Sequence, residues 1–404
     1  MTFLAIPIGL GNGFNDDILY FRIIRANQTW VAPISGDMDV MLIGGHGGGG
    51  CARSSSSTTS LSDVYTTTGA GAGETAIKLS YHVVAGSSYT ITIGYPGGAA
   101  SAITTSSYTA KSGGSGGESK FVGPGINMNA KAGAGAGSAW ASNDAAGGEG
   151  GYGGTGGSYH FPGGNGGSSD INGNWNGVVY PTGSGSVNLT YGYVPGTLTN
   201  AQIIKLTELT RGGNRYYPSG FGSSINIGPT GGGGCGGTGG DQLGSVTNGA
   251  TTNTGGGGAG GDGAVITGTS INTVAFGGPD ANMTLPATAI IGNMPVISFK
   301  DIPMRFCLAA IGGGTGALAA NTDITKPGGG GRGGNGANLN ATKAGFMGGM
   351  GGAYIASAAI TGHAGTNLCS PGQSVASIGA TATVVQGGEG DSGLCIIIIR
   401  KPKT

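Results

Sequence analysis

The chain has 404 residues, of which 94 are glycine and 16 are proline, and its 18 basic and 18 acidic side chains cancel to a formal net charge of zero. Charged residues make up 9% of the sequence and form no basic patch, so the electrostatic signature of nucleic-acid binding is missing. No apolar run approaches the ~20 residues of a membrane span. We therefore expect neither nucleic-acid binding nor membrane insertion.

Five widely spaced cysteines and no C-x-x-C motif argue against a disulfide framework and against a zinc site. They are Cys51, Cys235, Cys307, Cys369 and Cys395. Reduced thiols that act as small packing groups are the better interpretation, and they are compatible with assembly in a cytoplasm. Residues 1–11 (MTFLAIPIGLG) lack a basic region and carry a proline in their short apolar run, so we do not expect a signal peptide.

Residues 1–37 are poor in glycine and are expected to form an N-terminal attachment segment. The stretch DDILYFRII is apolar, aromatic and β-branched, which predicts a short strand or helix with a hydrophobic face. The candidate attachment residues are Ile18, Tyr20, Phe21 and Trp30. The rest of the chain, residues 38–404, is predicted to be one glycine-rich domain.

Several short strands are predicted around the glycine-rich sequence. Residues 39–43 (DVMLI) read as a buried strand that runs directly into glycine, and residues 89–95 alternate apolar and polar side chains as a half-buried strand does. An apolar stretch at 77–84 precedes residues 89–95, and residues 85–88 between these two stretches suit a hairpin loop. The apolar stretch at 394–400 is expected to lie beside 39–43, because both need partners for their backbone groups.

Glycine tracts with a period of three organise the sequence. Residues 147–157 read GGEGGYGGTGG, and the period returns at 113–118, 163–168, 233–241, 257–262, 330–335 and 348–353. Three residues per turn is the repeat of the extended left-handed polyproline-type helix, and glycine at two of every three positions lets neighbouring chains approach closely. We interpret the tracts as packed polyglycine II helices. Mobile linkers are the alternative, whereas collagen would need an unbroken repeat rich in proline.

The predicted fold is therefore mostly irregular and β: short β-strands at a base, an elongated bundle of polyglycine II helices, and almost no α-helix. Residues 201–209 (AQIIKLTEL) have the only passable helical pattern. Denser inserts between the tracts carry aromatic side chains, which either cap the ends of the bundle or form a recognition surface. The candidate receptor-binding residues are Trp140, Tyr159, His160, Phe161, Trp175, Tyr180, Arg215, Tyr216 and Tyr217. Tyr152 lies within a tract and is expected to be packed.

No catalytic constellation stands out from the glycine background. A G-x-S-x-G match at 113–117 lies in a period-three tract and not at a strand–helix turn, so it does not indicate a hydrolase. Asp241 and Asp262 lie in matches to a calcium-binding repeat, but such sites need tandem copies, so they are weak calcium candidates. His46 and His363 stand beside glycine and are expected to fill space between tracts. We expect no enzyme activity and no cofactor.

The pattern resembles a known class of phage protein. Three features look like the glycine-rich domains of bacteriophage tail-fibre proteins: WVAP at 30–33 leading into VMLIGGHGGGG at 40–50, YTITIG at 89–94, and a terminal glycine tract followed by an apolar strand at 387–399. The period-three tracts are similar to those of the tip adhesins of T-even-like phages, in which stacked polyglycine helices carry loops that set host specificity. The resemblance implies a virion adhesin assembled in the host cytoplasm, with other fibre proteins and a bacterial surface protein or glycan as partners.

Two other functions are compatible with the sequence. One is a purely structural fibre or spike protein whose loops bind only other subunits. The other is a glycine-rich ice-binding protein, although the side chains that project from the tracts are not the regular threonine or alanine row that such a surface requires.

Overall fold

The structure is a computed structural model, and the part of the chain that it describes is mostly β-strand. It describes residues 18–54, 65–104, 108–140, 145–169, 177–178, 181–188, 191–208, 210–213, 225–226, 232–233, 242–247, 250–255, 262–267, 270–276, 290–291, 349–355, 360–365, 371–378 and 384–402. These residues contain one short helix, α1 (Asn200–Glu208), which confirms the mostly β fold. No helix among them has the length and apolar character needed to cross a membrane.

Helix α1 begins with a reciprocal pair of hydrogen bonds. The main-chain N–H of Gln202 donates to Oγ1 of Thr199 at 3.4 Å, and the N–H of Thr199 donates to Oε1 of Gln202 at 2.9 Å. This capping box satisfies donors that have no partner within the helix. Ile203 and Leu206 are buried, and Tyr193 packs against them, so the helix covers a side of the molecule through one apolar face.

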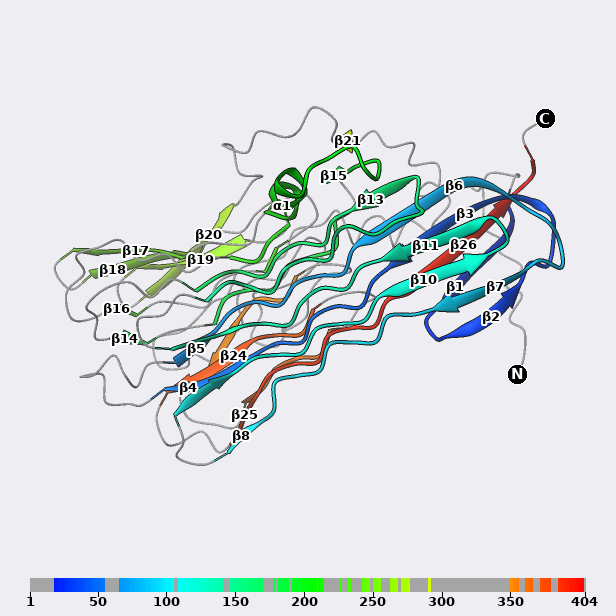
Figure 1. The fold of residues 1–404 in the computed structure, drawn as a ribbon. Coiled ribbons are helices and arrows are strands. Elements are labelled where there is room, and N and C mark those ends of the chain that lie inside the picture. The colour runs from blue at the N-terminus through cyan, green and yellow to red at the C-terminus, as the bar shows by residue number, and fades with distance from the viewer. Residues whose placement is uncertain are drawn as a thin grey trace, which may run out of the picture.

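Two antiparallel sheets pack face to face at one end of the molecule, which we call the base sandwich (Figure 1). The order of the five-stranded sheet is β1 (Ile18–Ile24), β26 (Leu394–Arg400), β3 (Gly36–Ile43), β6 (Thr75–Val83) and β13 (Tyr159–Phe161). The order of the four-stranded sheet is β11 (Ile126–Ala130), β10 (Ser119–Gly123), β7 (Ser88–Thr92) and β2 (Gln28–Val31).

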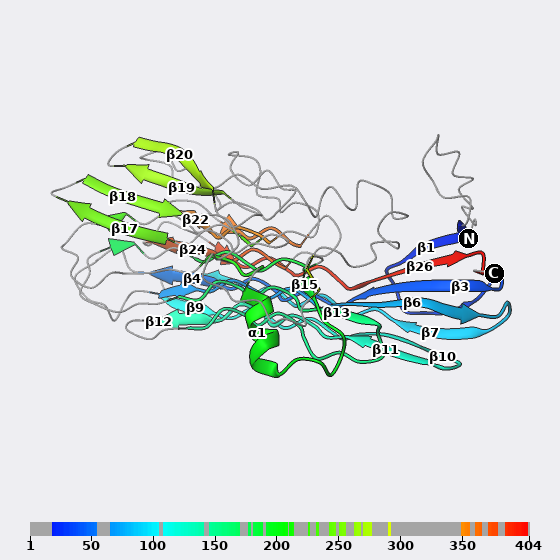
Figure 2. The same cartoon turned by 90° about the horizontal axis from the view of Figure 1, so that it is seen from above.

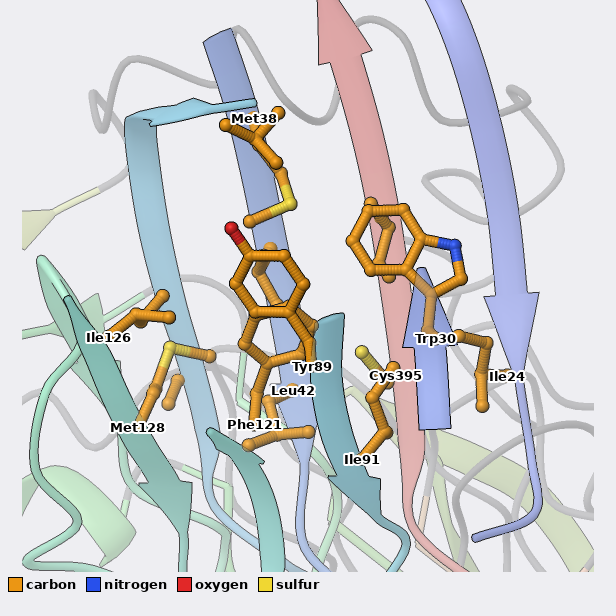
Figure 3. Packing of buried hydrophobic residues seen from close by; sticks show 14 of the residues in the cluster. Ile24, Trp30, Met38, Leu42, Tyr89, Ile91, Phe121, Ile126, Met128 and Cys395 are labelled. Atoms are coloured by element: carbon orange, nitrogen blue, oxygen red, sulfur yellow. The ribbon is translucent and has the colours of Figure 1, made fainter. Parts of the chain in front are cut away.

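The two sheets share a core of alternating inward side chains (Figure 3). Met38 and Cys395 come from the five-stranded sheet, and Trp30, Tyr89 and Phe121 come from the four-stranded one. The rings of Tyr89 and Phe121 stack with centroids 5.1 Å apart. This cluster is the apolar core of the base sandwich.

The expected neighbourhood of the two apolar strands is confirmed. Strand β26 pairs with β3 over its whole length, from Leu394 opposite Ile43 to Arg400 opposite Asp37. Nε of Arg400 donates to Oδ2 of Asp39 at 3.0 Å, and this charge pair is almost fully buried.

The hairpin expected at residues 85–88 is wrong. Strand β6 pairs within the five-stranded sheet and β7 within the four-stranded sheet, so the turn between them, with Gly86 at φ 85°, crosses from one layer to the other. The reason is packing: Val83 and Tyr89 both belong to the core between the layers, and facing sheets bury both side chains together.

Glycine-rich segments lead from the base sandwich to the opposite end and back (Figures 1 and 2). We call them the connecting segments; they are residues 44–50, 68–74, 93–100, 112–118, 131–137, 145–157, 162–169, 181–188, 371–374 and 387–393. They contact one another through main-chain hydrogen bonds, and they carry little side-chain volume.

Segment 44–50 illustrates how these hydrogen bonds repeat every three residues. Its N–H groups point in turn to three different neighbours: Gly44 to Glu74 (2.9 Å), Gly45 to Gly117 (2.8 Å), His46 to Asp391 (3.0 Å), Gly47 to Gly71 (3.0 Å), Gly48 to Gly114 (2.8 Å) and Gly49 to Gly388 (2.7 Å). Its carbonyl groups accept from three further segments: Gly45 from Gly133, Gly48 from Ala136, His46 from Gly97, Gly49 from Ala100, Gly47 from Gly372 and Gly50 from Val375. One segment is thus hydrogen-bonded to six others.

Close approach of the segments explains the glycines. A Cβ atom at Gly47 would lie 1.9 Å from the carbonyl oxygen of Ala134, and one at Gly48 would lie 2.0 Å from that of Gly98. Backbone cannot yield to such overlaps as a flexible side chain can. These positions therefore exclude every other residue type at the observed spacing.

Short strands also form at the end away from the base sandwich, where the sequence predicted none. A four-stranded sheet has the order β22 (Ala353–Ile355), β24 (Val375–Ile378), β4 (Cys51–Ser54) and β9 (Thr109–Lys111). A three-stranded sheet has the order β23 (Ile360–Thr361), β25 (Val384–Gln386) and β8 (Ile103–Thr104), and β12 (Ser138–Trp140) pairs with β5 (Tyr65–Thr67). We call these strands the distal sheets.

The remaining strands belong to smaller groups. An antiparallel meander consists of β17 (Gln242–Thr247), β18 (Ala250–Gly255), β19 (Asp262–Thr267) and β20 (Ser270–Phe276). Strand β14 (Gly177–Val178) pairs with β16 (Ile225–Asn226), and β15 (Tyr191–Gly192) pairs with β21 (Ile290–Ile291). The glycine tracts at 257–262 and 330–335 lie almost wholly outside the described residues.

The boundary expected between residues 37 and 38 falls within β3. Strands β1 and β2 pair with β26 and β7, so the described part of the N-terminal segment belongs to the same sandwich as the rest of the chain.

Candidate functional site

The distal sheets bring together the ends of strands that are far apart in the sequence. Strand β4 lies between β24 and β9, β5 pairs with β12, and β8 pairs with β25. Inserts 55–64, 105–107, 141–144 and 379–383 begin and end at these strands or at a segment beside them. The inserts lie outside the described residues, but their points of departure are neighbours at one end of the molecule (Figure 1).

Trp140 is the aromatic candidate that the structure places at this end. It is the last residue of β12, lies opposite Tyr65 of β5, and has 50% of its surface exposed. The hydroxyl groups of Ser138 and Ser112 lie 3.3 Å apart next to it, on the exposed side of β12. An exposed indole beside hydroxyl groups offers a flat apolar surface with polar surroundings.

Several of the other candidates lie outside the described residues. They are Trp175, Tyr180, Arg215, Tyr216 and Tyr217. Strand β14 lies in the chain between Trp175 and Tyr180, and Figure 1 places it at the same end as β5.

The prediction that Tyr159, His160 and Phe161 form part of a receptor-binding surface is wrong for two of them. The three residues form β13, which pairs with β6 in the base sandwich, at the opposite end of segment 145–157 from Trp140. Phe161 and His160 are fully buried, and Tyr159 is half-buried. Phe161 packs with Ile77 on the face of the five-stranded sheet that points away from the sandwich core. The polar, glycine-rich sequence around Phe161 gave no sign of this burial.

The attachment candidates also include both half-buried residues and a fully packed one. Ile18, Tyr20 and Phe21 are half-buried on β1, an outer strand of the five-stranded sheet, and their role stays a prediction. Trp30 is only 2% exposed, with its indole N–H 3.2 Å from the hydroxyl of Tyr20 and its ring beside Phe121. The prediction that Trp30 is an attachment residue is wrong, because its ring is packed inside the core.

A buried acid and imidazole meet where the base sandwich joins the connecting segments. Oε1 of Glu74 lies 2.7 Å from Nδ1 of His160, and neither side chain is exposed. The carboxylate also accepts the main-chain N–H of Lys131 at 2.9 Å and that of Gly154 at 3.0 Å. Burial raises the pKa of the Tyr193 hydroxyl nearby, and Glu74 raises this pKa further. This buried acid–imidazole pair therefore holds main-chain groups at the junction.

Two buried serines, one at the start of β10 and one in segment 181–188, have a role that the sequence analysis missed. The hydroxyl of Ser119 accepts the N–H of Gly94 at 2.8 Å and donates to the carbonyl of Ile43 at 2.7 Å. Ser184 bridges Ala70 and Gly372 in the same way. These buried hydroxyl groups replace main-chain partners where three segments meet. Ser184 stands between two glycines in the sequence, whereas Ser119 does not, and nothing in the sequence says which segments either serine joins.

The histidines beside glycine behave differently from each other. His46 fills the space between segments as expected: it is fully buried, and its Nδ1 accepts the N–H of Gly73 at 3.0 Å. Burial lowers the pKa of His46 to about 4, with Asp391 opposing and Arg25 adding to the shift. His363 is exposed, so the same expectation is wrong for it.

The cysteines that the structure describes, Cys51 and Cys395, are free and buried, as expected for packing groups. Burial raises the pKa of Cys51 to about 11, so it is a thiol at neutral pH. Asp262 begins β19, whereas Asp241 lies outside the described ranges. Within those ranges no group of three or more His, Cys, Asp or Glu side chains is placed to hold a metal ion.

Comparison with known proteins does not assign the chain to a family: no family model matches it, and no curated protein is similar to it in sequence.

Proposed function

We propose that the connecting segments form a bundle of polyglycine II helices, and that the chain is a non-catalytic bacteriophage tail-fibre or tail-tip adhesin. The bundle would hold receptor-binding inserts at the distal sheets. The receptor would be a protein or glycan of a bacterial surface. Other fibre proteins would contact the base sandwich, and the virion would be its place of action after assembly in the host cytoplasm.

The hydrogen-bond repeat of segment 44–50 supports the helical part of the proposal. A polyproline-type helix has three residues per turn and no internal hydrogen bonds, so its N–H and C=O groups point outward in three directions each. Bonds from one segment to six neighbours, returning every third residue, fit that geometry. A β-strand would alternate between two neighbours.

The exposure pattern supports the same interpretation. Along the outer segment that begins at Tyr95, exposed residues recur at Gly98, Ser101 and Thr104, again every third position. The side chains in this row differ in size and chemistry. A regular ice-binding row is therefore not favoured.

The observation that carries the adhesin proposal is the separation of the two ends. Strands β1 and β26 pair at the base sandwich, whereas inserts from four distant parts of the sequence leave from the distal sheets. Rigid segments between the two ends would hold the inserts in place and reduce the entropy lost on binding. The resemblance to glycine-rich tail-fibre domains supports the same function.

A structural fibre protein is the second candidate. It is favoured by the burial of Trp30, His160 and Phe161, since these three predicted contact residues support the fold instead. Under this function the inserts would bind only other virion subunits, and the purified chain would not bind cells.

A binding experiment with matched variants separates the two candidates. The fluorescently labelled chain is mixed with a panel of bacterial species, and bound label is measured by flow cytometry. Trp140→Ala should weaken binding, whereas Val84→Ala, at the base sandwich and 56% exposed, should not. Both variants must melt as the parent does.

Absence of binding to every species, or equal binding by both variants, would count against an adhesin whose receptor surface includes Trp140. Truncation of a ring at a binding hot spot costs about 2 kcal/mol or more, so loss of such a contact at Trp140 should reduce affinity by roughly thirtyfold or more.

A further inference from the structure

We propose that Glu74 is a hub that couples the base sandwich to the connecting segments, so that the two parts behave as one rigid body. The inference concerns how the fold transmits position from one end to the other. It does not depend on what the distal sheets bind.

The first argument is the place of Glu74 in a repeating series of hydrogen bonds. In segment 145–157, Gly148 donates to the carbonyl of Gly69 at 2.8 Å, and Gly151 donates to that of Ala72 at 2.9 Å. By the same step of three, the next donor, Gly154, would reach Thr75. Thr75 already begins β6 and pairs with Ile43 and Phe161 in the five-stranded sheet. The carboxylate of Glu74 accepts the Gly154 N–H instead, at 3.0 Å to Oε2.

A second series ends at the same side chain. The N–H groups of Thr68, Gly71 and Glu74 donate in turn to the carbonyls of Gly137, Ala134 and Lys131. At the last step the Lys131 N–H donates back to Oε2 of Glu74 at 2.9 Å. Lys131 directly follows β11 of the four-stranded sheet. The carboxylate thus closes both series where segments become strands.

The third contact ties in the outermost strand of the five-stranded sheet. Oε1 of Glu74 lies 2.7 Å from Nδ1 of His160. The main chain of His160 pairs with Tyr193 in both directions, at 2.8 and 2.7 Å. A buried N–H group that loses its acceptor is costly, so the acceptor at this junction matters for both series.

The geometry therefore predicts a local uncoupling when the carboxylate is removed. Glu74→Leu keeps a side chain of similar size but has no oxygen atom, so the N–H groups of Lys131 and Gly154 lose their acceptor. Glu149→Leu is the matched control, since Glu149 lies in the same segment as Gly154 and is exposed.

Hydrogen exchange measured by mass spectrometry tests the proposal. In E74L, amides of 131–137 and 147–157 should exchange about tenfold faster or more, while those of 36–43 and 394–400 keep the protection of the parent. E149L should leave all four regions unchanged. Equal acceleration in all four regions, or none in 131–137 and 147–157, would overturn the hub.

The parent chain provides a test that does not need the variant to fold. If Glu74 holds the junction, the amides of Lys131 and Gly154, read singly by electron-transfer fragmentation, should exchange as slowly as those of β3. Exchange of these two amides at the rate of exposed turns such as 84–87 would refute the proposal even if E74L cannot be purified.

Discussion

At the scale of single residues, glycine sets the distance between connecting segments. Gly48→Ala should destabilise the fold by about 3 kcal/mol or more, because the new Cβ would lie 2.0 Å from the carbonyl oxygen of Gly98 and backbone would have to move. Urea denaturation of the purified variant measures this loss.

The other side of the same contact provides the control. Gly98 has nothing within 4 Å of an added Cβ, so Gly98→Ala should change the free energy of unfolding by less than about 1 kcal/mol. Equal stability of the two variants would mean that the segments are spaced more widely than the structure indicates.

The burial of His46 makes the free energy of unfolding depend on pH. Its pKa in the folded chain, about 4, lies below the ordinary value of 6.5, because burial disfavours the imidazolium. Between these two values the unfolded chain binds a proton that the folded chain does not. Stability should therefore fall as pH falls through this window, with about 2–3 kcal/mol lost by pH 4.5. Protonation would also remove the acceptor of the Gly73 N–H.

His46→Asn isolates this effect, since an amide oxygen can replace Nδ1 as acceptor but does not titrate. Urea denaturation of parent and variant at pH 7.5 and 4.5 should give a smaller loss in the variant by about 2 kcal/mol. Parallel losses in both proteins would assign the acid sensitivity to other groups.

At the scale of elements, buried hydroxyl groups join segments that the chain does not connect directly. Ser119→Ala would leave the Gly94 N–H and the Ile43 carbonyl without their partner in a buried site, at a cost of about 1–3 kcal/mol for each orphaned group. Ser115→Ala is the comparison, because Ser115 is exposed and accepts the Gly135 N–H at 3.4 Å. Denaturant titration should show a loss for the first variant and almost none for the second.

The sequence predicted elements better than it predicted their partners. Alternation in residues 89–95 and the apolar run at 394–400 correctly indicated strands, because side-chain period follows directly from local geometry. The partner of β7 could not be read in this way, since facing layers and a hairpin both satisfy its alternation. Residues 159–161 failed for a related reason: three residues are too few to show a period, and Ile77, which covers Phe161, is distant in sequence.

For the candidate site, sequence reasoning placed Trp140 correctly in an exposed position but grouped it with residues at the opposite end. Trp140 and Tyr159 were grouped because both are aromatic side chains of inserts between glycine tracts. An extended segment instead separates its two flanks by its whole length, so neighbours in sequence become opposite ends in space.

At the scale of the whole molecule, the strand order makes β26 indispensable. It lies between β1 and β3 and supplies Cys395, Ile397 and Ile399 to the sandwich core. Deleting residues 394–404 should abolish cooperative unfolding in a calorimeter, since two strands would lose their partner at once. Deleting only 401–404 should leave the transition unchanged, because Lys401 and Pro402 are exposed. A normal transition after the longer deletion would show that the sheet closes without β26.

The position of β26 also bears on how the protein is made. Ribosomes release a chain from its N-terminus, and domains generally begin to fold as they emerge. Here β1 and β3 are synthesised early, yet the strand that joins them follows every other strand in the described chain. During translation the edges of β1 and β3 that pair with β26 therefore stay unpaired until β26 is made. Unpaired strand edges favour association with other chains. Slow synthesis or crowded expression should promote aggregation of nascent chains, and a chaperone that shields strand edges should raise the soluble yield.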